Sequence, residues 1–307
     1  MSEMTISVGM PQSLLHHEFG TLWLSIFKSL GVSVVESGAT TKAILDRGTA
    51  LSIDESCLPL KVYVGHVDSL LSACSHVFVP RIVEYYPNYY FCAKFAGLPD
   101  IIKNTFSLPP ERLISPTLKG SSVAAALGAV HSVCKSLSVS SCAGQKAYYH
   151  ALAEWKNRSQ PKDSQAVKPK IAVVGHSYIL EDSFFSQDIM RPLAAQGVTI
   201  VTPKSIPNKK LYDEAKQFRS DIYWQLSAKI AGATHFFCRQ DDIAGIILVS
   251  SFGCGPDSLV NEYLEHHVLQ TSGKPYMILT MDEHTGKAGL CTRVEAFWDM
   301  VERRIMS

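Results

Sequence analysis

Short hydrophobic runs alternate with longer mixed stretches along almost the whole chain. Between the runs, apolar residues recur at helical spacing, as Leu14, Trp23 and Phe27 do within residues 14–30. Alternation of strands and helices is typical of parallel sheets that are covered by helices on both faces. Runs rich in β-branched residues predict eight strands, at residues 5–10, 32–36, 76–80, 112–116, 170–175, 199–203, 246–250 and 275–281.

A polar segment divides the chain into two similar halves. Residues 157–170, NRSQPKDSQAVKPK, hold two prolines and no aromatic residue, which predicts a linker. On either side, VGMPQSLLHHEFG and VVGHSYILEDSFFSQD both read as strand, turn and helix. We therefore predict an α/β protein with two similar, doubly wound, flavodoxin-like domains at residues 1–120 and 170–307. A helical segment and the linker, residues 121–169, would bridge the domains or cap the first.

Composition and charge restrict the class of protein. The 307 residues are 46% hydrophobic, enough for a sizeable core. The 29 basic and 28 acidic side chains leave a net charge of +1, which excludes nucleic acid as a partner bound through bulk charge. The apolar runs are far shorter than the roughly 18 residues that cross a bilayer. The first residues lack the features of a secretory signal. We therefore expect a cytoplasmic protein with no membrane partner.

The position of Cys254 after a predicted strand makes it the first candidate for chemistry. Ligands of parallel sheets collect outside the carboxyl ends of the strands. Cys254 lies between Gly253 and Gly255, and Pro256 and Asp257 then suit the first turn of a helix. A helix N-terminus favours the thiolate, which attacks electrophiles and ligates metals. The alternative is a buried cysteine in a glycine-rich turn.

Cys57 and Cys92 have a similar local sequence. Pro59 suggests that a helix begins just after Cys57, and Lys61 would lie on the same face of it. Cys92 ends an aromatic segment and is followed by Lys94. Free cysteines are commonly plain core residues, which is the alternative for both.

The other cysteines give no functional signal. No pair has the C-x-x-C spacing, and the spacings of zinc fingers and ferredoxins are absent, so local spacing does not predict a metal. We assign five cysteines mainly to packing: Cys74, Cys134, Cys142, Cys238 and Cys291. Of these, Cys238 ends an aromatic run, and its role stays open.

Four segments together resemble a known superfamily. They are DESCLPLKVYVGHVDSLL, VFVPRIVEYYPNYYFCAKFAGLPDII, SFGCGPDSLVNEYL and MDEHTGKAGLCTRVEAFWDM. The chain resembles the 2-hydroxyacyl-CoA dehydratase superfamily, and within it the acyl-CoA dehydratase activase-related branch. The resemblance implies that Cys57, Cys92 and Cys254 hold a 4Fe–4S cluster in the crevice between the domains. Some relatives carry a double-cubane 8Fe–9S cluster instead, which is the alternative cofactor.

The resemblance also implies a function and partners. It suggests low-potential electron transfer or reductive and radical chemistry, as in an anaerobic dehydratase (a lyase) or a reductase. A separate ATP-dependent activator would donate the electron, and the chain would form a homo- or heterodimer. The sequence has no G-x-x-x-x-G-K-[ST] motif, so we do not expect it to be the ATP-hydrolysing activator itself. Ala93 stands where relatives often have proline, which departs from the pattern of the true dehydratases. The alternative is a non-enzymatic electron carrier or cluster-holding protein.

Several polar residues are candidates for supporting roles. Glu283 and His284 follow a predicted strand, and could act as acid–base groups or as a fourth cluster ligand. His176 and Glu55 are similar candidates, and capping or turn formation is the alternative for all four.

Cations near the cysteines could balance the charge of a buried cluster. Lys61, Lys94 and Arg81 are the candidates, and the alternative for each is an ordinary solvated side chain. A cysteine hydrolase that pairs Cys254 with His284 or His176 is a further alternative, although the glycines around Cys254 do not have the spacing of a nucleophile elbow.

Overall fold

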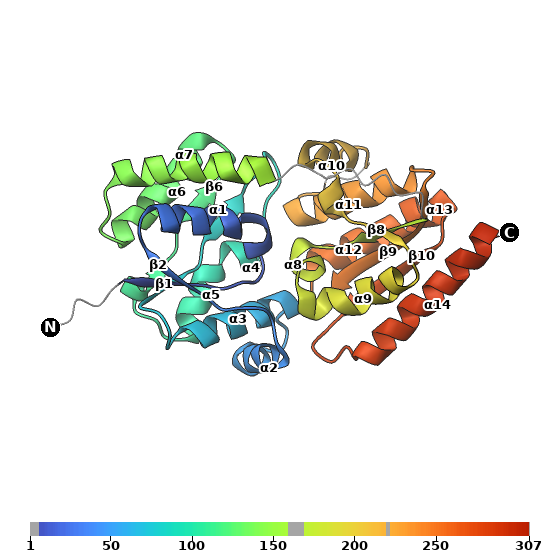
Figure 1. Cartoon of the computed structure of the whole chain (residues 1–307), viewed down its shortest axis with the longest axis horizontal. Helices are drawn as coiled ribbons and strands as arrows, with labels where there is room; N and C mark the ends of the chain where they lie inside the picture. The colour runs from blue at the N-terminus through green and yellow to red at the C-terminus, as the bar shows by residue number, and fades with distance from the viewer. Residues whose placement is uncertain (1–5, 159–168, 219–221, 307) are drawn as a thin grey trace. The chain divides into compact units, whose positions relative to one another are not determined.

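The chain divides into two compact units. The structure is a computed structural model that describes residues 6–158, 169–218 and 222–306 (Figure 1). Unit 1 is Met1–Gln160 and unit 2 is Pro161–Ser307.

Unit 1 contains a four-stranded parallel sheet with the order β2-β1-β3-β5. Its strands are β1 (Ser7–Met10), β2 (Ser33–Glu36), β3 (His76–Phe78) and β5 (Leu113–Ile114). A second, two-stranded parallel sheet joins β4 (Arg81–Glu84) to β6 (Thr117–Lys119).

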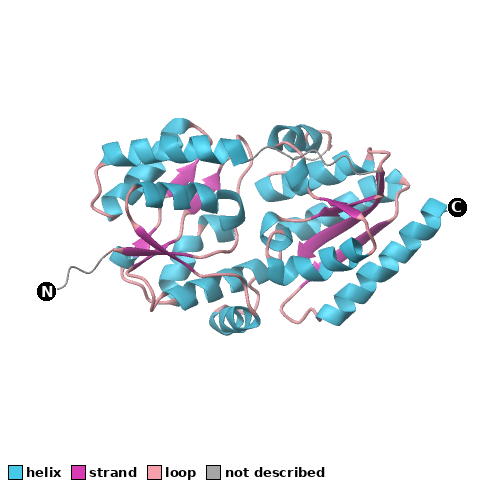
Figure 2. Ribbon diagram, viewed as in Figure 1, coloured by secondary structure: helices cyan, strands magenta, loops and turns pink. Residues whose placement is uncertain are grey.

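The helices of unit 1 cover both faces of its main sheet, with α1 on one side and α2 and α3 on the other (Figures 1 and 2). Ser25 of α1 donates a hydrogen bond to Glu154 of α7 at 2.6 Å, which joins these two helices. The helices are α1 (His16–Ser29), α2 (Lys42–Leu51), α3 (Leu58–Leu70), α4 (Ala93–Ala96), α5 (Leu98–Thr105), η1 (Pro110–Arg112), α6 (Val123–Ser136) and α7 (Ser141–Arg158).

Unit 2 contains a four-stranded parallel sheet with the order β10-β9-β7-β8. Its strands are β7 (Lys170–Val174), β8 (Thr199–Val201), β9 (Ile243–Ser251) and β10 (Tyr276–Met281). Nearly every residue of β9 is buried, as expected for a central parallel strand with helices on both faces.

The helices of unit 2 supply its core. Ile246 and Leu248 of β9 belong to one apolar cluster with Ile230 of α11 and Leu264 of α12. The opposite face of β9 packs against α14, where Phe297 and its neighbours approach Gly245. The helices are α8 (Ser177–Leu180), α9 (Ser183–Ala195), η2 (Pro203–Ser205), α10 (Asn208–Ala215), α11 (Gln225–Cys238), α12 (Gly255–Leu264), η3 (Glu265–Leu269), α13 (Gln270–Ser272) and α14 (Lys287–Met306).

The two units repeat one topology. When the strands of each main sheet are numbered along the chain, both sheets have the order 2-1-3-4. In each unit a tightly packed pair of helices connects the second strand to the third along the chain. The pair is α2 and α3 in unit 1, and α10 and α11 in unit 2. The prediction of two similar, doubly wound, flavodoxin-like sheets is confirmed.

All eight predicted strands are present, with small differences at their ends. Strands β4 and β6 were not predicted. Helices α6 and α7, expected to bridge the domains or cap the first, pack on each other within unit 1, and α7 also packs on α1. Helix α7 continues to Arg158 and β7 begins at Lys170, and most of the predicted linker lies outside the described residues.

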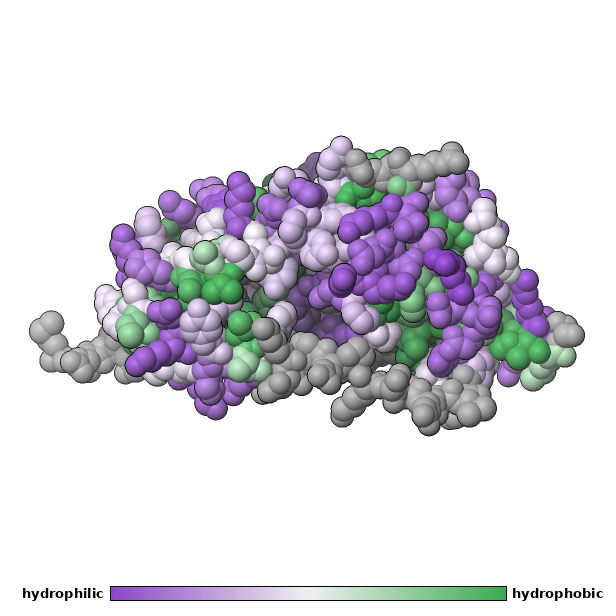
Figure 3. Space-filling view, turned by 90° about the horizontal axis from the view of Figure 1, so that it is seen from above, coloured by the Kyte–Doolittle hydropathy of each residue, from purple (hydrophilic) through white to green (hydrophobic). Residues whose placement is uncertain are grey.

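Within the described residues, no helix combines the length and the apolar composition needed to cross a bilayer. The face in Figure 3 carries mainly polar side chains, with apolar ones in small groups among them.

Candidate functional site

The candidate site of unit 2 lies where its strand order reverses. Strands β7 and β9 are adjacent, and their crossover connections leave the sheet in opposite directions. Open parallel sheets bind ligands at such a point, outside the carboxyl ends of the strands. His176 follows β7 and Cys254 follows β9, so both residues belong to this edge of the sheet.

The sequence around Cys254 builds a sharp turn into a helix. Gly253 has a φ of +76°, a left-handed conformation that glycine adopts without steric cost. Cys254 is then the N-cap of α12, Pro256 lies in the first turn, and the buried Asp257 follows it. The predicted helix start is therefore confirmed, and the thiol lies beside a helix N-terminus.

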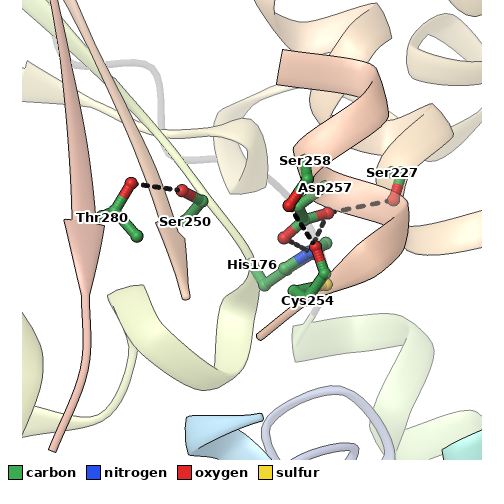
Figure 4. A network of polar contacts seen from close by, with 7 residues as sticks. All are labelled: His176, Ser227, Ser250, Cys254, Asp257, Ser258 and Thr280. Atoms are coloured by element: carbon green, nitrogen blue, oxygen red, sulfur yellow. Dashed lines mark hydrogen bonds and ion pairs between the residues drawn. The ribbon is translucent and has the colours of Figure 1, made fainter. Parts of the chain in front are cut away.

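Asp257 is the centre of a buried hydrogen-bond network (Figure 4). Its carboxylate oxygens lie 2.7 and 2.9 Å from Nε2 of His176. Ser227 of α11 donates its hydroxyl to Oδ1 at 3.0 Å, and the Cys254 thiol also bonds to the carboxylate. His176 and Asp257 are 4% and 2% exposed, so the pair is shielded from water.

The network controls the protonation of Asp257. Burial acts to raise the pKa of this carboxyl group. The His176 imidazole, together with the hydrogen bonds from His176, Ser227 and Cys254, outweighs burial and holds the pKa below its ordinary value. The buried group is therefore a carboxylate near neutral pH.

This network also groups three kinds of metal ligand. One ligand atom each of His176, Cys254 and Asp257 lies within 4.8 Å of the other two. Imidazole, thiolate and carboxylate are the side chains that bind zinc and related transition metals.

Unit 1 brings Cys57 and Cys92 together. Cys57 is the N-cap of α3, and Cys92 is the N-cap of α4. Burial raises the pKa of the Cys92 thiol, and the backbone amides of Phe95 and Lys94 oppose that rise. Cys57 lies close enough to Cys92 to raise the pKa of its thiol further. Lys94 also donates to the backbone carbonyl of Glu55 at 3.4 Å, which joins the two cysteine segments. Cys254 belongs to unit 2.

The three cations proposed to balance a cluster have different environments. Lys61 is only 4% exposed, so the alternative that it is a solvated surface residue is wrong. Lys94 is half-buried. Arg81 forms an ion pair with Asp100 at 2.7 Å and donates to the carbonyl of Ala96, so its guanidinium supports the α4–α5 segment.

The segment of Glu283 and His284 forms a turn after β10. Asp282 accepts hydrogen bonds from the His284 amide and the Thr285 hydroxyl, both through Oδ1. The His284 side chain is exposed and that of Glu283 is half-buried. The segment thus forms a turn, which was the alternative given for these residues. An acid–base role for the Glu283 or His284 side chain stays a prediction.

The cysteines assigned to packing do not all lie in the core. Cys134 is fully buried and Cys74 is 8% exposed, as predicted. Cys238 and Cys291 are half-buried. For Cys142, in α7, the prediction is wrong, because its side chain is exposed.

Sequence reasoning did not find two members of the network. Ser227 lies inside a helix with no nearby motif, and Asp257 was noticed only as a residue of a helix start. The partner of Asp257, His176, is 81 residues away along the chain. Local spacing carries no signal for such a contact.

Fold and site together define a two-unit parallel α/β protein with cysteines at helix N-termini. The sequence matches the family described as CoA enzyme activase uncharacterised domain (DUF2229) over residues 7–206, and the chain belongs to this family. The match agrees with the resemblance to the acyl-CoA dehydratase activase-related branch. It includes Cys57, Cys92 and His176 and ends before Cys254. No curated protein matches the chain.

Proposed function

We propose that this chain is an iron–sulfur protein that serves the activation or the reaction of a CoA-dependent enzyme. In this proposal Cys57, Cys92 and Cys254 hold a 4Fe–4S cluster. The observation that carries the proposal is that each of these three cysteines is the N-cap of a helix.

The helix N-termini suit the charge of the proposed group. A cluster held by three thiolates is anionic, and burying an anion is costly without donors or cations around it. A helix N-terminus directs free amides and the positive end of its dipole at an anion. In unit 1 the amides of Lys94 and Phe95 favour the Cys92 thiolate. The donor set therefore fits an iron–sulfur cluster.

Two lysines support the same proposal in unit 1. The buried Lys61 follows Cys57 by one helical turn, and its amide donates to the Cys57 carbonyl at 3.2 Å. Lys94 acts on Cys92 as a nearby positive charge, which opposes the rise that burial causes in the pKa of its thiol. Both cations would balance the negative charge of the thiolates.

The chemistry of the cluster gives the function. When bound, a 4Fe–4S cluster supplies low-potential electrons to a substrate such as an acyl-CoA thioester or to a partner protein. The family description suggests a partner among CoA-dependent enzymes. The chain lacks a phosphate-binding motif, so a separate ATP-dependent protein would deliver the electron.

The cysteine hydrolase alternative has less support. A nucleophilic cysteine needs a base that accepts its proton, usually a histidine nitrogen. The Cys254 thiol bonds to Asp257, and Nε2 of His176 is bound to the same carboxylate. His284 is exposed in the turn that follows β10.

The test is anaerobic purification and reconstitution, followed by measurement of iron, sulfide and visible absorption. We expect about four iron atoms per chain, whereas a double cubane would give about eight. Cys57→Ala, Cys92→Ala and Cys254→Ala should each lose the sulfide and the colour of the cluster. Cys142→Ala is the matched control, because this exposed thiol caps no helix, and it should keep both.

Two results would overturn the proposal: reconstituted wild-type protein without iron, or equal sulfide in the three variants and the control. A change in the electron paramagnetic resonance signal on addition of an acyl-CoA thioester would indicate an enzyme. An unchanged signal would indicate an electron carrier.

A further inference from the structure

His176, Cys254 and Asp257 form a group that the proposed cluster does not explain. Of these three residues, only Cys254 would bind the cluster. The buried imidazole of His176 and the buried carboxylate of Asp257 nevertheless lie beside Cys254. We propose that these three side chains hold a single divalent transition cation, of the zinc or ferrous type, when Cys254 is not bound to a cluster. The inference goes beyond the proposed function and does not depend on it.

The distances suit one ion. Zinc lies about 2.3 Å from cysteine sulfur and about 2.0–2.2 Å from imidazole nitrogen or carboxylate oxygen, so two of its ligand atoms are roughly 3.3–3.8 Å apart. The three ligand atoms here already lie within 4.8 Å of one another. Nε2 of His176 is 2.7 Å from Asp257, so this pair would separate by about 0.5–1 Å to admit the ion.

The charges of the ligand set also suit a divalent cation. A thiolate, a carboxylate and a neutral imidazole together carry two negative charges, which one divalent cation neutralises. Burial makes this balance important, since an unpaired charge is costly away from water. A mixed set of sulfur, nitrogen and oxygen ligands favours zinc or ferrous iron over magnesium or calcium, which prefer oxygen alone.

The surroundings of the three ligands resemble those of a metal site. Ser227 donates to Asp257 from outside the group and fixes the orientation of its carboxylate, as outer-shell partners do. Ser251, whose carbonyl accepts the Cys254 amide, has a buried hydroxyl with no hydrogen-bond partner among the described residues. Three protein ligands would leave a fourth position for water or a substrate, the arrangement of catalytic zinc sites.

The single-ion site and the cluster share Cys254, so one excludes the other. They differ in their remaining ligands. The cluster requires Cys57 and Cys92 of unit 1, whereas the single ion requires His176 and Asp257 of unit 2. Variants of these two pairs therefore test the two proposals separately.

The experiment titrates the full-length, metal-free, reduced protein with cobalt(II), whose thiolate charge-transfer and d–d absorption bands report the ligands. We expect one cobalt per chain with a thiolate band, displaced by zinc. Cys254→Ala should lose the band. Loss of an outer-shell partner lowers metal affinity about 10–100-fold, and we expect Ser227→Ala to fall within that range. His176→Ala and Asp257→Asn should each lower the affinity for cobalt by more than this.

Cys57→Ala and Cys92→Ala are the matched controls, and both should bind cobalt as the wild type does. Loss of the band in either control would place cobalt at the cluster cysteines and overturn the single-ion site. Wild-type binding by His176→Ala and Asp257→Asn would also overturn it. Circular dichroism of each variant separates loss of a ligand from loss of folding, and the conservative Asp257→Asn keeps the size of the side chain.

Discussion

Cys92 and Cys254 occupy the same topological position in the two units. Cys92 caps the first helix after the third strand of its main sheet, and Cys254 does the same in unit 2. Unit 1 adds Cys57 at the N-cap of the helix that precedes the third strand, where unit 2 has Trp224. Unit 2 instead surrounds its cysteine with His176 and Asp257. The repeated fold thus carries two different sets of proposed ligands.

The repeat extends to a close helix–helix contact. Gly65 is the eighth residue of α3, and Gly232 is the eighth residue of α11. A Cβ atom at Gly65 would lie 2.0 Å from the Ile44 carbonyl oxygen, and one at Gly232 would lie 1.9 Å from that of Leu211. Only glycine permits this approach of the two backbones.

We therefore expect Gly65→Ala and Gly232→Ala to destabilise the protein by about 1–3 kcal/mol or more, because the helices must move apart. Chemical denaturation followed by circular dichroism measures this change in the free energy of unfolding. Gly128→Ala is the matched control: it lies within α6 with no atom near the added carbon, and should be neutral or stabilising by up to about 1 kcal/mol. Equal effects at all three positions would contradict the close-packing argument.

The elements that could be predicted are those that a short stretch of sequence identifies by itself, through a continuous apolar run or a proline at a helix start. The run at 246–250 identified β9 because a central parallel strand is buried on both faces. Strands β4 and β6 were not predicted, because the aromatic, proline-containing segment that separates them in the chain obscures any alternation of apolar and polar residues. Pro59 and Pro256 indicated the helix starts at Cys57 and Cys254, since proline suits the first turn.

The contacts that build the site could not be predicted in the same way. The bond between His176 and Asp257 depends on two adjacent strands that are far apart in the chain. Lys61 is buried because α3 packs closely on its neighbours, which overrides the usual exposure of lysine. Both features are consequences of tertiary packing, which residue spacing does not encode.

The cysteines should differ in their reactivity with alkylating reagents. Cys142 is exposed, whereas Cys134 is fully buried and burial raises the pKa of its thiol. A buried thiol reacts only after local opening, and an opening cost of roughly 3 kcal/mol slows it about a hundredfold. Timed iodoacetamide labelling with peptide mass spectrometry should therefore find Cys142 modified well before Cys134. Denatured protein is the control, in which the two rates should converge, and early labelling of Cys134 in the folded protein would contradict its burial.

His66 should make the stability of unit 1 depend on pH. Its imidazole is fully buried between the hydroxyls of Ser37 and Thr40, at 2.8 and 2.9 Å. Burial, followed by the charges of His17 and His16, lowers its pKa from 6.5 to about 4. A neutral imidazole has one donor and one acceptor nitrogen, so one hydroxyl donates to the ring and the other accepts from it.

The sign of the effect follows from proton binding. Between pH 6.5 and about pH 4 the unfolded chain binds a proton at His66 that the folded chain does not. The contribution of the neutral His66 imidazole to the free energy of unfolding is therefore fully present above pH 6.5. It falls by up to about 3 kcal/mol as the pH drops to about 4. Urea denaturation across this range should show the loss in the wild type and a smaller loss in His66→Gln. His16, whose pKa burial also lowers to about 4, adds a similar slope that should persist in the variant. Identical pH profiles for the two proteins would show that His66 does not remain neutral in the folded state.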